Sequence, residues 1–244
     1  MTAGAAFRRA IAIRGRPGRV DADLEDDFHR FGVTLHHDDV RLIAVEGRAM
    51  RYPWVTCLEA PAALNALCGM TLGAHPTALF RHADPRAHCT HLFELAALAM
   101  PQAMRDEGVR LYEAEVDDPV GGAGAARLFR DGVLALEWTL AGDVITAPPV
   151  FAGRDIASFR TTALADQPPD LAEYLMILRR VTQTAKGRRL DVDAFATAAD
   201  MGRSAQCYSL QPAAAARANR VKGSIRNWPD RAALLRSVHH RSEL

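Results

Sequence analysis

The stretch that decides the predicted fold reads Asp84-Pro85-Arg86-Ala87-His88-Cys89-Thr90-His91-Leu92-Phe93-Glu94-Leu95-Ala96-Ala97-Leu98-Ala99-Met100. Asp84 is a typical N-cap residue and Pro85 suits the first helical position, so we expect a helix to begin there. The helix would be apolar nearly all round and therefore largely enclosed. It also carries two imidazoles and a carboxylate, on His88, His91 and Glu94. Such groups cost folding free energy in a buried place unless they are paired or used.

The composition is that of an ordinary globular chain. It has 244 residues, of which 49% are hydrophobic and 24% charged, with a formal net charge of +1. This balance gives no electrostatic case for nucleic acid or an anionic membrane. The N-terminus lacks the apolar run of a signal peptide, and no segment approaches the roughly 18 apolar residues of a membrane helix. We expect a cytoplasmic protein that binds neither nucleic acid nor membrane, and we leave homo-oligomerisation open.

Alternating apolar residues predict an antiparallel sheet around the helix. Residues 27–46 have the pattern of a hairpin, and residues 109–116 have that of a strand opening a meander with a turn at Asp131-Gly132. We therefore predict an α+β fold: a curled antiparallel sheet or partial barrel wrapped around a central apolar helix, with additional outer helices. A single domain is expected over residues 1–244, with residues 1–10 and 230–244 frayed.

The histidines form the candidate catalytic group. His88 and His91 are three residues apart, which on a helix places them on neighbouring positions of one side. His29 has the strand parity of Phe31 and is expected to point into the same interior. Imidazole titrates near neutrality, so one ring can abstract a proton while another donates one. Glu94 or Asp27 would orient the base.

Aromatic and amide side chains are the expected substrate-binding groups. Tyr52 would stabilise developing oxyanion charge, and Trp54 would form an aromatic wall. Tyr208 with Gln211 would supply a polar edge, and Phe31 an apolar one. The chain has no Gly-x-Ser-x-Gly sequence, Walker loop or dinucleotide fingerprint, so we expect no cofactor.

These observations favour a cofactor-independent acid/base lyase acting on a small, aromatic molecule. A concrete version is retro-aldol release of formaldehyde from a phenolic compound. Three alternatives stay open: an acyl-CoA thioesterase-like hydrolase, a metal-dependent hydrolase, and a non-catalytic ligand-binding protein. A metal would be held by His88, His91 and His29, with or without Glu94. The three-residue spacing argues against this, because zinc helices usually space their histidines four apart.

Several segments together resemble a bacterial family of unknown function, the domain-of-unknown-function family numbered 2889. They read Glu25-Asp26-Asp27-Phe28-His29-Arg30-Phe31-Gly32, Arg51-Tyr52-Pro53-Trp54-Val55-Thr56-Cys57, His88-Cys89-Thr90-His91-Leu92-Phe93-Glu94-Leu95, Phe151-Ala152-Gly153 and Cys207-Tyr208-Ser209-Leu210-Gln211-Pro212. The resemblance covers roughly residues 10–228, with the segments in the family's order. It implies a shared fold and pocket rather than a reaction. Where the family commonly has Asp after the His-Cys-Thr-His-Leu-Phe run, this chain has Glu94.

Overall fold

The computed structural model describes residues 6–105, 107–202 and 207–235. The chain divides into two compact units. We call Ala12–Val109 with Asp191–Arg226 the histidine unit, and Met1–Ile11 with Arg110–Leu190 and Asn227–Leu244 the meander unit. The single domain expected from the sequence stays a prediction.

The strands are β1 (Ala6–Arg16), β2 (Arg19–Asp26), β3 (Arg30–His37), β4 (Leu42–Arg51), β5 (Gly108–Asp117), β6 (Ala123–Arg130), β7 (Val133–Ala141) and β8 (Val144–Ala147). The α-helices are α1 (Thr90–Ala99), α2 (Thr161–Leu164), α3 (Pro169–Ala185) and α4 (Pro212–Ala215), and short 3-10 helices join them. The strands hydrogen-bond in the antiparallel order β4-β3-β2-β1-β5-β6-β7-β8. The α+β class is therefore confirmed, but the partial barrel is not, because β4 and β8 remain sheet edges.

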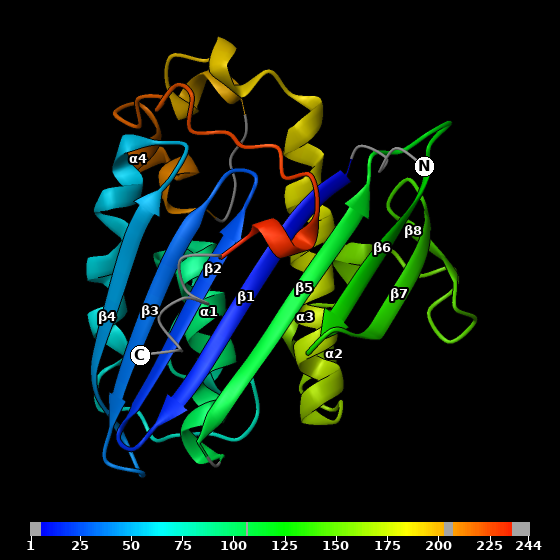
Figure 1. Ribbon diagram of the computed structural model, residues 1–244. Helices are drawn as coiled ribbons and strands as arrows, with labels where there is room; N and C mark the ends of the chain where they lie inside the picture. The colour runs from blue at the N-terminus through cyan, green and yellow to red at the C-terminus, as the bar shows by residue number, and fades with distance from the viewer. Residues whose placement is uncertain (1–5, 106, 203–206, 236–244) are drawn as a thin grey trace. The chain divides into compact units, whose positions relative to one another are not determined.

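In the histidine unit, β2, β3 and β4 form an antiparallel meander, which confirms the predicted hairpin. Leu24 pairs with Phe31 and Val20 with Leu35. Helix α1 packs on β2 and β3 (Figure 1). All ten of its residues are buried, as expected for a helix that is apolar nearly all round. The more specific expectation that the sheet curls around this helix stays a prediction.

The predicted helix start at Asp84 is wrong. Asp84 does act as an N-cap, since its side chain accepts a hydrogen bond from Arg86 N at 2.9 Å, but it caps the three-residue 3-10 helix η4 (Pro85–Ala87). The chain is then extended at His88, with φ −122° and ψ 164°. Helix α1 begins only at Thr90. His88 and His91 therefore do not lie on one helix face.

The meander unit contains β5–β8, and α3 packs on β6 and β7. The turn predicted at Asp131-Gly132 is present, and both residues have positive φ, 51° and 82°. Residues 6–10, expected in a frayed end, are instead buried in β1. Residues 1–5 and 236–244 lie outside the described residues. Across the described ranges, no helix is long and apolar enough to cross a bilayer.

Candidate active site

The short connection between β2 and β3 is built around the side chain of Asp26. Its Oδ1 accepts hydrogen bonds from the backbone N–H groups of Phe28 at 2.8 Å and His29 at 2.7 Å. The backbone N–H of Asp26 in turn donates to the carbonyl of His29 at 2.9 Å. An aspartate that begins a turn commonly bonds the backbone two or three residues further on. The turn therefore holds both the Asp26 carboxylate and the His29 backbone.

The same carboxylate orients the His29 ring. Nδ1 of His29 lies 3.0 Å from Oδ1 of Asp26, and the Asp26 side chain is fully buried. An ionised carboxylate only accepts hydrogen bonds, so Nδ1 carries the proton and donates it. In a neutral ring the lone pair is then on Nε2. This is how a buried aspartate prepares a histidine to act as a base in a catalytic triad.

His91, in the first turn of α1, brings a second ring to this place. The His29 and His91 ring centroids are 4.0 Å apart with an interplanar angle of 34°. Both residues are buried, with 8% and 7% of their surfaces exposed. Two imidazolium charges at this distance would repel by about 4 kcal/mol at an effective dielectric constant of 20. The pair is therefore suited to hold one added proton rather than two.

Phe31 forms an apolar wall beside both imidazoles. Its ring stacks on that of His29 at 5.5 Å and lies 6.0 Å from that of His91. Of the predicted group of His29, His88, His91 and Phe31, the structure brings together His29, His91 and Phe31.

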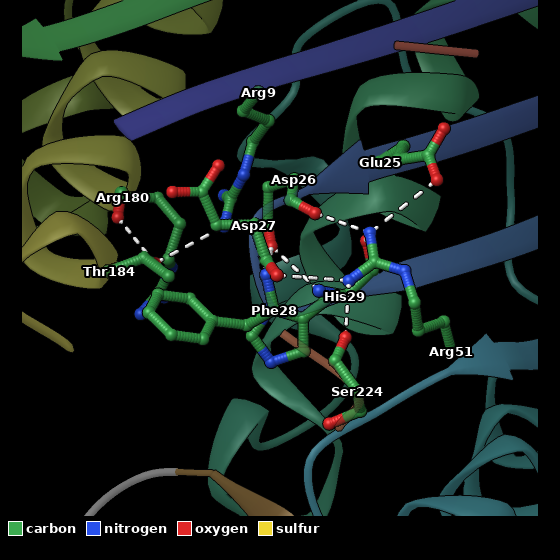
Figure 2. Close-up of polar contacts among 10 residues, drawn as sticks. All are labelled: Arg9, Glu25, Asp26, Asp27, Phe28, His29, Arg51, Arg180, Thr184 and Ser224. Atoms are coloured by element: carbon green, nitrogen blue, oxygen red, sulfur yellow. Dashed lines mark hydrogen bonds and ion pairs between the residues drawn. The ribbon is translucent and has the colours of Figure 1, made fainter. Parts of the chain in front are cut away.

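Arg51, at the end of β4, supports the turn from the other side (Figure 2). Its guanidinium donates to the backbone carbonyls of Asp26, Asp27, His29 and Ser224. The distance is 3.0 Å to Asp27, 3.1 Å to His29 and 3.0 Å to Ser224. It also lies 3.5 Å from the Glu25 carboxylate. Burial lowers the pKa of Arg51, while the Asp26 and Glu25 charges oppose that shift.

The two acidic residues predicted to orient the base, Asp27 and Glu94, lie close in sequence to His29 and His91 respectively. Asp27 is buried, and its carbonyl accepts from Arg51 and from the backbone N–H of Arg226 at 2.7 Å. The carboxylate that contacts the His29 ring is that of Asp26, one residue earlier. Glu94 is buried on α1, about one turn after His91.

His88 does not join the two other histidines. Its ring packs against Phe93, with centroids 4.8 Å apart, and the residue is 3% exposed. Within the described ranges its Nδ1 has no hydrogen-bond partner. Burial lowers the pKa of His88, and the nearby Asp84 carboxylate opposes that shift only in part. These properties describe a neutral ring held in apolar packing.

The predicted substrate-binding residues are spread over several contacts. Trp54 is buried, with the Arg220 guanidinium 5.8 Å from its ring centroid, while Tyr52 is half-buried two residues before it. Tyr208 donates from its hydroxyl to Glu59 at 3.2 Å. Gln211 donates from its side-chain amide to the carbonyl of Arg86.

Sequence reasoning missed Asp26 and Arg51. A signal for Asp26 was available, because an aspartate that ends one strand, three residues before His29, is typical of a turn-forming residue. Arg51 had no such signal, since most of its acceptors are backbone carbonyls, which carry no residue-type pattern.

The chain was compared with known protein families and with curated proteins. It matches no family model and no curated protein. The resemblance to the family numbered 2889 accordingly stays a prediction.

Proposed function

We propose that the protein is a cofactor-independent acid/base lyase in which the Asp26–His29 pair and His91 transfer the protons. The observation that carries this proposal is the buried contact of the two rings, one of them oriented by a carboxylate. Buried, paired imidazoles beside a carboxylate are more typical of sites than of simple core packing. The packing of His88 against Phe93 makes it a weaker candidate for the base than His29.

The roles follow from the hydrogen bonds. Asp26 holds Nδ1–H of His29, so Nε2 of His29 abstracts the proton from the substrate. His91, at 4.0 Å between centroids, delivers a proton to the developing carbanion or oxyanion. Tyr52, in the extended segment after Arg51, remains the proposed hydrogen-bond donor to the oxyanion. Glu94 would then assist His91 from the same helix.

The substrate class that suits these groups is a small aromatic alcohol. Phe31 beside the two imidazoles supplies an apolar, aromatic wall. In the retro-aldol version, the hydroxyl proton of a hydroxymethyl group passes to His29 as the C–C bond breaks and formaldehyde leaves. The electron pair goes to the carbon that remains. His91, which carries the one added proton of the pair before the reaction, protonates that carbon as His29 takes up the hydroxyl proton.

Formaldehyde release from a panel of phenols that carry hydroxymethyl side chains tests the proposal. The reaction is run in the presence of a metal chelator. We expect turnover that falls about 10²–10⁴-fold in His29→Gln and in Asp26→Asn, because one general base is lost or misoriented. His82→Gln is the matched control, since His82 is exposed. Full turnover in His29→Gln would refute the assignment.

A metal-dependent hydrolase is the second candidate, and one observation favours it. Asp26, His29 and His91 each offer a ligand atom within 4.8 Å of the others. Against it, Oδ1 of Asp26 already accepts three N–H groups. Hydrolysis of ester substrates that disappears in chelator and returns with added metal would support this candidate over the lyase.

A further inference from the structure

The same three residues have a second property that acid/base chemistry does not use. One ligand atom from each of Asp26, His29 and His91 lies within 4.8 Å of the other two, and all three residues are buried. Two imidazoles and one carboxylate form the donor set that proteins use for first-row transition metals with open coordination positions. We infer that these residues also bind a divalent transition metal ion, and that the bound ion switches off the acid/base pair.

The spacing of the donors indicates which ions fit. Nδ1 of His29 and Oδ1 of Asp26 are 3.0 Å apart. An ion about 2.1 Å from each would see them at an angle of about 90°. The other carboxylate oxygen of Asp26, Oδ2, lies 3.4 Å from the same nitrogen, which corresponds to an angle of about 108°, so the spacing admits octahedral Co²⁺ and Ni²⁺ as well as tetrahedral Zn²⁺. Three protein ligands leave the remaining positions to water.

Binding would change the protonation of His29. The ion takes the place of the Nδ1 proton, which is released to solvent. A neutral imidazole with a metal on Nδ1 keeps its hydrogen on Nε2 and is no longer a base there. A nitrogen lone pair of His91 is taken as well. The inhibitory half of the inference therefore rests on the proposed function, whereas metal binding does not.

The net charge around the site allows a cation. Arg51 is one nearby positive group, and its guanidinium bonds the carbonyl of Asp26. Glu25, at 3.5 Å from Arg51, offsets that charge. The Asp26 carboxylate itself then remains to compensate the ion.

Calorimetric titration of chelator-treated, desalted full-length protein with Co²⁺ tests the binding. A variant carrying His239→Gln and His240→Gln serves as the background, because that adjacent pair is a separate source of imidazole ligands in the sequence. We expect one Co²⁺ per chain. Removal of an imidazole in His29→Gln or His91→Gln should weaken binding by at least about 100-fold, while His82→Gln leaves it unchanged.

Each outcome decides the inference. Unchanged affinity in both His29→Gln and His91→Gln would overturn the site. If either variant fails to fold, the NMR signals of the His29 and His91 rings are followed instead in the unaltered protein as Co²⁺ is added. Selective paramagnetic broadening of these signals supports the site, and absence of broadening overturns it. Inhibition of turnover at the Co²⁺ concentration that saturates binding supports the switch, and activation overturns it. Binding without any turnover, with or without metal, would instead refute the proposed lyase while the metal site stands.

Discussion

Replacing Arg51 by methionine should destabilise the protein strongly, because one guanidinium holds the turn that carries His29. Four backbone carbonyls accept from it, and the side chain is only 13% exposed. A hydrogen bond to a charged group contributes about 1.5–3 kcal/mol, so four represent a gross loss of roughly 6–12 kcal/mol. A large part of this gross loss is offset, because water can bond the vacated carbonyls and the cost of burying the guanidinium is removed. We expect a net loss of about 3–5 kcal/mol in the free energy of unfolding.

Urea unfolding followed by circular dichroism measures this loss. The stability of Arg51→Lys should fall between that of the unaltered protein and that of Arg51→Met, since an ammonium keeps the charge but cannot span the same acceptors. Arg226→Met is the matched control, because the exposed Arg226 side chain bonds only the carbonyls of Gly223 and Ile225 beside it. A loss below about 1 kcal/mol in Arg51→Met, or one equal to that of Arg226→Met, would contradict the reasoning.

Glu173→Gln should cost about 3–5 kcal/mol of unfolding free energy, because the fully buried Glu173 carboxylate accepts from Arg110 at 2.6 Å and the negative charge beside this buried guanidinium would be lost. Gly47→Ala should cost about 1–3 kcal/mol, because the added Cβ would lie 2.8 Å from Cβ of Pro61. His88→Gln should reduce the loss of stability between pH 7 and pH 5. Since burial lowers the pKa of His88, the unfolded chain binds the additional proton first, and stability falls as the pH drops through the unfolded value of about 6.5.

Urea unfolding checks the first two of these predictions, and the same measurement repeated at pH 7 and pH 5 checks the third. Glu137→Gln is the control for Glu173→Gln: its ion pair with Arg127 is well exposed and should contribute less than about 1 kcal/mol. A loss in Glu173→Gln as small as that of Glu137→Gln would contradict the buried-pair argument. If the free energy of unfolding depends on pH identically in His88→Gln and in the unaltered protein, the burial of His88 does not lower stability at acidic pH.

The strands could be predicted from the sequence because their signals are local. Alternation along Phe31, Val33 and Leu35 and the turn at Asp131-Gly132 each depend on neighbouring residues. The start of α1 could not be located in the same way, because Asp84 and Pro85 suit the first turn of a 3-10 helix as well as that of an α-helix.

The site was predicted in part, for related reasons. The parity of His29 with Phe31 correctly indicated a shared interior, and His91 joins them since α1 packs on β2 and β3. The choice between Asp26 and Asp27 depends on where β2 ends, and a shift of one residue reverses the face of a side chain. Hydrophobic alternation does not fix that boundary, and the position of Asp26 three residues before His29, typical of a turn-forming aspartate, is the local signal for it.

The meander unit is assembled from three separate pieces of the chain, and this has a consequence for how it forms during synthesis. β1 is made first and can pair with β2, which follows it directly, but its other neighbour, β5, begins only at Gly108. Closing so long a loop slows the pairing of β1 with β5. The β2–β4 meander, by contrast, joins segments that leave the ribosome in succession. The histidine-bearing turn between β2 and β3 can thus take shape while the strands of the other unit are still being translated.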